Sequence, residues 1–273
     1  MEYQKSLEFQ MKALNINISL YGEMHTAIPV LYKSLGNTYS LMRKHNDVLE
    51  YRLKALQINL SLHGETHQET LNSYHLVAIA YENLRQPEKC LENRLKALQI
   101  SQSLNGKTHK DTLELHRQIV LSYERLHQYE KAVEHRLKIL EINISLHGKL
   151  HQDVIDSHSQ LISAYQRLQD DKKVLEHRLK ILEIHRSFYG EASPETASSY
   201  FEIGNVYKNQ KAYQRAINFF SKALAMYQLL FQQNTSFLQR SRYPINELKV
   251  KIQDCQKEIE YGAIQVFETN NFT

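Results

Sequence analysis

The chain has 273 residues, of which 42% are hydrophobic and 23% charged, and its formal net charge is +4 with 14 neutral histidines. These values exclude collagen-like, disulfide-rich and disordered classes, and the interleaving of basic with acidic residues argues against a nucleic-acid partner. Only 8 Gly and 4 Pro are present, so we expect few loops and an all-α fold rather than a β-rich or doubly wound α/β fold.

Neither a membrane span nor a secretory signal is expected from the sequence. No apolar run reaches the length of a membrane-spanning helix, and the first residues, MEYQKSLEFQ, are polar and charged. Cys90 and Cys255 lie far apart in the sequence and suit a reducing compartment. We therefore expect a cytoplasmic protein that does not bind a membrane.

One unit of 42 residues recurs along the chain. Its clearest copies are LEYRLKALQINLSLHGETH at 49–67, LENRLKALQISQSLNGKTH at 91–109 and VEHRLKILEINISLHGKLH at 133–151. Further copies begin at Leu7, at Leu175 and, in degenerate form, at Ile217. The phase is constant, because glycine returns at 22, 64, 106, 148 and 190 and tyrosine at 39, 81, 123, 165 and 207. Self-similarity at a fixed period of this length is typical of a repeat architecture.

The chain opens on a predicted helix over residues 3–21, and the same pattern returns in every unit; we call it the B-type helix. In the second copy its apolar stripe, at helical spacing, consists of Leu49, Leu53, Leu56 and Leu60. The recurrent glycine ends this helix, because a residue without a Cβ atom accepts a positive φ. No helix precedes the first B-type helix, so we expect either a fragment of a longer protein, which we favour, or an exposed N-terminal edge.

An A-type helix is predicted after each glycine, over about 68–84 in the second unit. Thr66 with Glu69, and Thr108 with Asp111, resemble capping boxes that would open it. The alternation predicts about five complete A/B pairs from 26 to 232, within an array that spans 1–232. A loop over 233–243, a capping helix over 244–261 and a tail over 262–273 follow. The apolar stripe of the capping helix would cover the last repeat and consists of Ile245, Leu248, Ile252, Cys255 and Ile259.

The units resemble tetratricopeptide repeats, in the 42-residue form of kinesin light chains. The resemblance covers residues 3–232 and rests on three groups of residues: Tyr74, Val77, Ala78 and Tyr81 in the A-type helix; Ala55, Leu56 and Ile58 in the B-type helix; Leu62, Gly64 and His67 in the turn. It implies a right-handed α-solenoid of helix-turn-helix pairs. The chain departs from the family where an aromatic residue of the B-type helix is replaced by Arg52, Arg94, Arg136 and Arg178, and only Phe220 retains it.

Histidines are frequent, but we expect no metal site. His63 with His67, and His147 with His151, have the spacing of a helical zinc-binding pair, yet a glycine interrupts each span and no cysteine lies beside it. We interpret them as helix-start or loop residues multiplied by duplication. Four further histidines recur with the unit: His116, His135, His158 and His177. We expect them to be packing or surface residues, and the alternative is that they form a pH-sensitive array.

The sequence also predicts no catalytic residues and no cofactor. It contains no glycine-rich phosphate loop and no G-x-S-x-G motif, and neither cysteine is accompanied by a placed His and Asn. A repeat array distributes similar residues evenly, whereas an active site needs unlike groups that converge in one pocket. We therefore expect a protein that is not an enzyme.

The resemblance implies that the A-type helices line a concave groove that binds a peptide. The candidate binding residues are Lys33, Asn37, His75, Ile79, Asn83, Arg117, Leu121, Arg125, Arg167, Asn205, Lys208 and Asn209. The alternative is that these are ordinary solvated positions. Lys33 and Asn37 match half of the carboxylate clamp of chaperone-binding repeats, but Leu76, Glu114 and Gln118 replace the other half. We therefore do not expect binding to chaperone tails.

Among these candidates, the arginines Arg117, Arg125 and Arg167 favour an acidic peptide, and Ile79 and Leu121 could hold one apolar residue of it. We thus predict a non-catalytic adaptor or scaffold that binds a peptide segment of a partner protein. The first alternative is a regulatory or sensor segment of a larger multidomain protein, such as an NTPase or a kinase. The second is self-association through the N-terminal edge.

Overall fold

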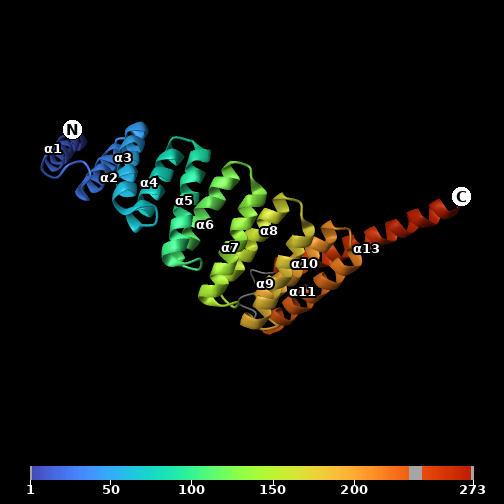
Figure 1. Cartoon of the computed structure of the whole chain (residues 1–273). Helices are drawn as coiled ribbons and strands as arrows, with labels where there is room; N and C mark the ends of the chain where they lie inside the picture. Colours follow the sequence, from blue (N-terminus) through green and yellow to red (C-terminus); the bar gives the residue numbers. More distant parts are fainter. Residues whose placement is uncertain (1, 234–241, 272–273) are drawn as a thin grey trace. The chain divides into compact units, whose positions relative to one another are not determined.

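The computed structural model describes residues 2–233 and 242–271 of the chain, which form helices joined by short turns (Figure 1). The A-type helices are α2 (Ala27–Leu41), α4 (Gln68–Asn83), α6 (Lys110–Arg125), α8 (Gln152–Arg167) and α10 (Pro194–Asn209). The B-type helices are α1 (Glu2–Tyr21), α3 (His45–His63), α5 (Pro87–Asn105), α7 (Tyr129–His147), α9 (Asp171–Tyr189) and α11 (Tyr213–Gln233). Helix α13 (Arg242–Asn271) follows. The predicted all-α class and the alternation of the two helix types are confirmed.

The helices form two compact units, Met1–Leu146 and His147–Thr273, which we call the N-terminal and the C-terminal unit. Within each unit, helices that follow one another in the chain pack together, as α4 does on α5 and α10 on α11. The interiors are apolar, as the stripes predict. Leu35, Ile119 and Ala97 are fully buried in the N-terminal unit, and Ile203 and Phe220 are fully buried in the C-terminal unit. None of the described helices combines the length and the hydropathy that crossing a bilayer requires.

Helix α13 packs on α11 and covers the apolar core of the last repeat. Leu248 and Cys255 of its stripe are fully buried in that core, whereas Ile259 is exposed. The helix is longer than predicted, because residues 262–271 continue it instead of forming a tail. That segment contains no proline, and its one glycine, Gly262, costs a helix only about 1 kcal/mol. Most of the predicted loop over 233–243 lies outside the described residues.

The recurrent glycines end the B-type helices as predicted. Each has a positive φ, for example +79° with a ψ of −174° at Gly64, a backbone region that is essentially confined to glycine. The amide of Gly64 still donates to the carbonyl of Leu60 at 2.9 Å. This hydrogen bond closes the last turn of α3.

The opposite turn, from an A-type to a B-type helix, also has a positive φ but no glycine. Arg85 has a φ of 56°, and the next amide, that of Gln86, donates to the carbonyl of Tyr81 at 2.9 Å. This bond is the signature of a Schellman motif. The same turn recurs at Arg43, His127, Gln169 and Lys211. In each of these turns the carbonyl of the repeated tyrosine accepts the equivalent hydrogen bond. The sequence does not reveal these turns, because they lack glycine.

Histidine, not threonine, caps three of the A-type helices. Nδ1 of His67 accepts a hydrogen bond from the amide of Glu69 at 3.1 Å, and His109 and His151 do the same for the second residue of their helices. The predicted capping boxes at Thr66 and Thr108 are therefore wrong. Each threonine lies one residue before the position from which a side chain reaches the free amides of the first turn.

Two equivalent glycines of A-type helices, Gly36 and Gly204, are expected to respond oppositely to alanine. A Cβ atom at Gly204 would lie 2.5 Å from the fully buried ring of Phe220, whereas one at Gly36 would lie 3.6 Å from Cγ of Arg52. We expect Gly204→Ala to lower the free energy of unfolding by about 1–3 kcal/mol. We expect Gly36→Ala to raise it by up to about 1 kcal/mol, because alanine favours a helix. Urea denaturation of both variants checks this; equal changes at the two sites would contradict it.

Candidate peptide-binding surface

All twelve predicted binding residues lie on A-type helices, and none of them is buried. Eight belong to the N-terminal unit: Lys33 and Asn37 on α2, His75, Ile79 and Asn83 on α4, and Arg117, Leu121 and Arg125 on α6. Four belong to the C-terminal unit: Arg167 on α8 and Asn205, Lys208 and Asn209 on α10. The predicted cluster of Arg117, Arg125 and Arg167 therefore has members in both units, and we describe each unit by itself.

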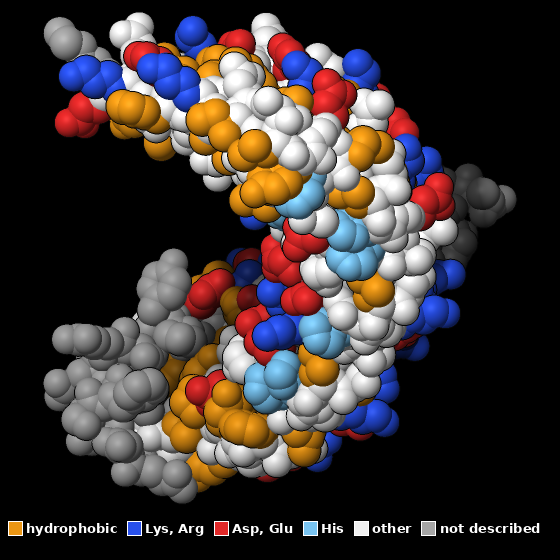
Figure 2. Space-filling model, turned by 60° about the vertical axis from the view of Figure 1, so that its left-hand side comes forward, with side chains coloured by type: hydrophobic (Ala, Val, Ile, Leu, Met, Phe, Trp, Pro, Cys, Tyr) orange, Lys and Arg blue, Asp and Glu red, His pale blue; other side chains and the backbone are white. Residues whose placement is uncertain are grey.

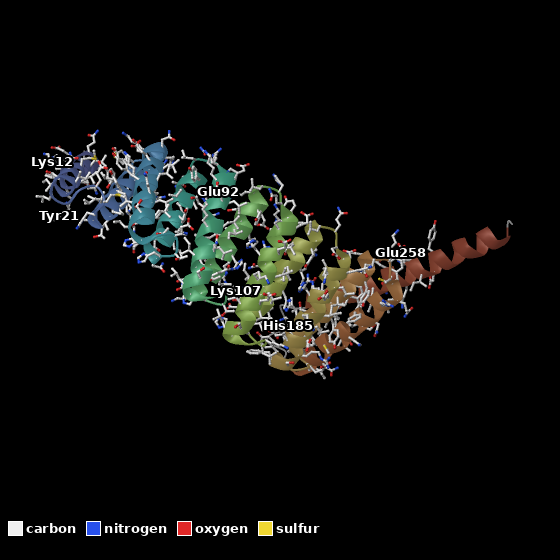
Figure 3. The ribbon with its side chains drawn as sticks, viewed as in Figure 1. Lys12, Tyr21, Glu92, Lys107, His185 and Glu258 are labelled. Carbon is white, nitrogen blue, oxygen red and sulfur yellow. The ribbon has the colours of Figure 1, made fainter. Side chains whose placement is uncertain are left out.

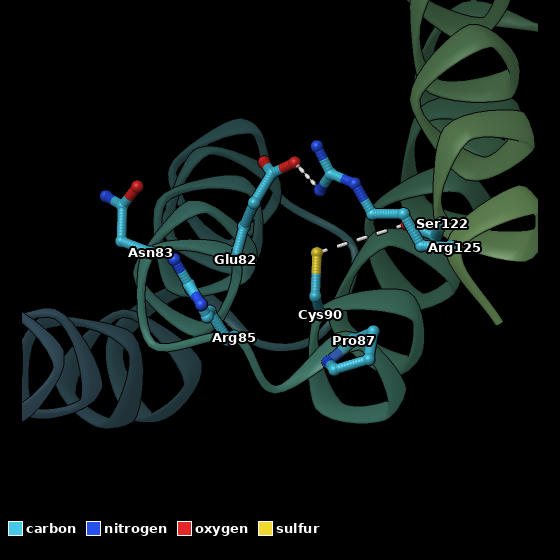
Figure 4. Close-up of a pocket in the computed structure, with 7 residues that line it drawn as sticks. All are labelled: Glu82, Asn83, Arg85, Pro87, Cys90, Ser122 and Arg125. Atoms are coloured by element: carbon cyan, nitrogen blue, oxygen red, sulfur yellow. Dashed lines mark hydrogen bonds and ion pairs between the residues drawn. The ribbon is translucent and has the colours of Figure 1, made fainter.

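A pocket of about 590 Å³ opens in the N-terminal unit where α4, α5 and α6 meet (Figure 4). Two predicted residues, Asn83 and Arg125, line it. The other lining residues are Glu82, Arg85, Pro87, Cys90 and Ser122. The Arg125 guanidinium of α6 forms an ion pair with the Glu82 carboxylate of α4 across the pocket (Figure 4).

Arg94, a buried arginine of α5, holds residues of this pocket in place. Its side chain is 4% exposed, and Nη2 lies 2.7 Å from Oε2 of Glu82. Nη1 donates to Oγ of Ser122 at 2.6 Å and to the carbonyl of Gln118 at 3.1 Å. Arg94 thus ties α5 to both neighbouring A-type helices. Although burial alone would raise it, the hydrogen bond from Arg125 and the charge of Arg94 lower the pKa of Glu82.

The arginines at the same position of the other repeats also bond to neighbouring helices, but their partners differ. Arg52 donates to the carbonyl of Leu76 at 2.8 Å, and burial lowers the pKa of its guanidinium. Arg136 pairs with Glu124 at 2.8 Å and Arg178 with Glu202 at 3.1 Å. The arginines that replace the aromatic residue of the family therefore link neighbouring helices, and Arg52 and Arg94 do so from the interior. Sequence reasoning identified the substitution but not its partners.

A second pocket of the N-terminal unit, of about 370 Å³, lies between α2, α3 and α4. Lys33 lines it beside the exposed side chain of Val30, while Asn37 is not among its lining residues. His75 of α4 is half-buried, and burial, reinforced by the charges of Arg94 and Arg52, lowers its pKa. His75 is therefore neutral near pH 7 and contributes no charge to the surface.

The other candidates differ in how far their charges are already paired. Arg117 lies 3.9 Å from Glu114 on the exposed side of α6, a weak contact. In the C-terminal unit Lys208 pairs with Asp254 of α13 at 3.2 Å, so the capping helix already pairs the charge of one predicted contact residue. Asn205 is half-buried and Asn209 exposed.

The charged pairs of the B-type helices, such as Lys12 with Glu8 and Glu92 with Lys96, lie on the solvent side; Lys12 and Glu92 are labelled in Figure 3.

The first helix also exposes large apolar side chains. Phe9 is 69% exposed, Leu20 67% and Ile16 57%. Figure 2 shows hydrophobic side chains among charged ones on the N-terminal helices, at the top of the view. Self-association through this helix stays a prediction.

Comparison with known proteins identifies the repeats. The tetratricopeptide repeat family matches residues 69–145 and 153–228, which make up more than half of the chain. The chain therefore belongs to the tetratricopeptide repeat family. Arrays of this kind are generally protein–protein interaction modules. No curated protein sequence matches the chain significantly.

The chain is also similar to solved structures. The nearly identical TPR-like repeats of a candidate kinesin light chain from Podosopora anserina are 18% identical over 77% of this chain and 95% of that chain, with a TM-score of 0.51. BtubC (BKLC) from P. vanneervenii is 16% identical over 84% of this chain and 89% of that chain, with a TM-score of 0.49. The apo form of RapI is 18% identical over 96% and 100%, with a TM-score of 0.46. The first of these confirms the expected resemblance in fold to repeats of the kinesin light chain type.

Proposed function

We propose that this protein is a non-catalytic adaptor or scaffold whose A-type helices bind an acidic peptide segment with one apolar residue. The observation that carries the proposal is the excess of arginine at the pocket between α4 and α6. Arg85 and Arg125 line this pocket and Arg94 lies beneath it, whereas Glu82 is the one carboxylate among the lining residues.

Arg125 retains the capacity to bind a second carboxylate. Glu82 has two oxygens, and they are divided between Arg94, which reaches Oε2, and Arg125, which reaches Oε1. The guanidinium of arginine has five N–H donors in a planar fork, and the side chain of Arg125 is 54% exposed. A carboxylate of a partner peptide can therefore approach Arg125 from solvent while Glu82 stays in place.

An apolar contact lies on the same face of α6. Arg117, Leu121 and Arg125 are spaced four residues apart, which aligns them along one side of a helix. Leu121 is 50% exposed although it is a large apolar side chain. The face thus offers an apolar contact between two cations, which suits a peptide in which an apolar residue lies between acidic ones.

The test uses a fluorescein-labelled ten-residue peptide of Glu and Ser around one Leu, with the full chain and fluorescence anisotropy. We expect the double variant Arg85→Gln with Arg125→Gln to bind it about tenfold more weakly, because two charge-assisted contacts are lost. Added salt should weaken binding to the unsubstituted chain.

The matched control is Lys54→Gln with Lys96→Gln, which removes the same charge from B-type helices whose lysines pair with Glu50 and Glu92 on the solvent side. We expect it to bind the peptide normally. Equal loss in the two double variants, or equal binding of a peptide with Lys in place of Glu, would contradict the proposal. Arg167, Asn205 and Asn209 of the C-terminal unit remain proposed further contacts. The cytoplasm remains the proposed compartment, and Cys90 and Cys255 are both free thiols.

A further inference from the structure

The turn that leads into α8 gathers three side chains with metal-binding atoms. His147 is the last residue of α7, His151 caps α8, and Asp153 lies in its first turn. One ligand atom of each lies within 4.8 Å of the others. Nε2 of His147 is 3.4 Å from Oδ2 of Asp153, and Nδ1 of His151 is 3.5 Å from the same oxygen. All three are accessible to solvent, so an ion can reach them.

The backbone holds these residues in place. Gly148 ends α7 with a φ of +81° and turns the chain so that the two imidazole rings stack, with centroids 4.4 Å apart and an interplanar angle of 19°. The expectation that no metal binds here rested on the interruption of the helix by Gly148. The structure shows that the turn itself brings the two histidines together and adds Asp153, which the sequence spacing does not reveal.

We propose that His147, His151 and Asp153 form a site for a divalent transition-metal ion, with Zn²⁺ as the best match. In a tetrahedral zinc site the ligand atoms lie about 2.0–2.1 Å from the ion, which places them roughly 3.3–3.4 Å from one another. Oδ2 of Asp153 lies 3.4 Å from Nε2 of His147 and 3.5 Å from Nδ1 of His151, close to this spacing. Two imidazoles and one carboxylate, with water as the fourth ligand, are donors that zinc accepts, whereas calcium and magnesium prefer oxygen alone.

Binding requires one local rearrangement. Nδ1 of His151 accepts the amide of Asp153 at 3.1 Å, and a single lone pair cannot also bind an ion. The ion therefore binds Nδ1 of His151, or binds Nε2 after the ring proton has moved to Nδ1, and in either case displaces this capping bond. The stacked rings rotate so that their nitrogens converge. Neither change affects the apolar core, because all three side chains lie at the surface.

Other repeats of the same chain supply matched substitutions. The turn before α6 has Asn105, His109 and Asp111 at the equivalent positions, so it differs from the proposed site only in the first ligand. His109 caps α6 as His151 caps α8, and its Nδ1 lies 3.5 Å from Oδ2 of Asp111. The repeats thus already accommodate both asparagine and histidine at the first position of this turn, as Asn105 and His147 show.

Isothermal titration of the metal-free full chain with ZnCl₂ tests the proposal. We expect His147→Asn to weaken zinc binding by at least about tenfold. We expect Asn105→His to add a second zinc ion of similar affinity. Circular dichroism should show unchanged helix content and melting temperature for both metal-free variants. His63→Asn serves as the control. The turn before α4 has Glu69 at the position of Asp153, and among the described residues its side chains form no such cluster, so zinc binding should be unchanged.

Absence of zinc binding by the unsubstituted chain would overturn the proposal. So would zinc binding that is unchanged in His147→Asn, because the ion would then be held by other residues.

Discussion

Acidification from pH 7 to pH 4 is expected to lower the free energy of unfolding of each unit by up to about 3 kcal/mol, through one histidine pair in each, of which only His135 is half-buried and the other three rings are buried. Nδ1 of His116 on α6 lies 2.8 Å from Nδ1 of His135 on α7. His158 on α8 and His177 on α9 repeat this contact at 2.8 Å. Burial lowers the pKa of all four imidazoles, to about 4 for His116 and His158.

The direction follows from proton linkage. An unfolded histidine binds a proton near pH 6.5, whereas these histidines bind it only at lower pH when folded. Between those values the unfolded chain holds more protons, so the contribution is complete above about pH 6.5 and is lost as the pH falls to about 4. Nearby charges modify the shift without reversing it: Lys138 and Glu141 at the first pair, Lys180 and Glu176 at the second. Urea denaturation at pH 7, 5.5 and 4 measures the effect.

Residues from neighbouring repeats provide the control. The pair Tyr74 and Asn93 occupies the equivalent positions one repeat before the first histidine pair, and Tyr200 and Phe219 do so one repeat after the second. We expect the fourfold variant His116→Tyr, His135→Asn, His158→Tyr and His177→Phe to retain its helices and to lose most of this pH dependence. The same acid destabilisation in that variant would show that other groups cause it.

Removal of the Glu82 carboxylate by Glu82→Ala is expected to destabilise the N-terminal unit by about 3 kcal/mol, because it leaves the buried Arg94 guanidinium without a counter-charge. The control is Glu92→Ala. Glu92 pairs with Lys96 at 3.0 Å, but the side chains are 62% and 49% exposed, so we expect a loss below about 0.5 kcal/mol. The shift in the urea midpoint distinguishes the two.

A second change separates the buried charge from a simple loss of packing. Combining Glu82→Ala with Arg94→Met replaces the buried charge with an apolar side chain, and we expect it to restore much of the lost stability. A double variant as unstable as Glu82→Ala alone would contradict this explanation.

The periodic features of this protein could be predicted from its sequence, because repetition presents each signal several times. The 42-residue phase, the two helix types and the glycines at 22, 64, 106, 148 and 190 all follow from it. Helix ends were harder to predict. Thr66 and His67 are adjacent and both can cap a helix, and only the backbone geometry shows that His67 does so.

The candidate binding surface was predicted only in part. All twelve candidate residues lie on A-type helices and none is buried, and their role in binding a peptide stays a prediction. The arrangement around Glu82, Arg94, Cys90 and Ser122 was missed, because these residues are brought together by helices from three successive parts of the chain. Asp153 was missed for a similar reason, since its carboxylate returns to His147 across a turn.

The arginines that link neighbouring helices limit how the repeats can be rearranged. Arg94 and Arg136 take their carboxylates from the preceding A-type helix, at Glu82 and Glu124, whereas Arg178 takes Glu202 from the following one. The preceding helix offers Gln166 at the matching position. Recombination that placed Arg94 after α2 would leave it without this carboxylate, because α2 has Ser40 at the position of Glu82, whereas recombination between the segments of α5 and α7 would keep a glutamate before the arginine. We therefore expect selection against rearrangements of the first kind, although the B-type segments are similar in sequence.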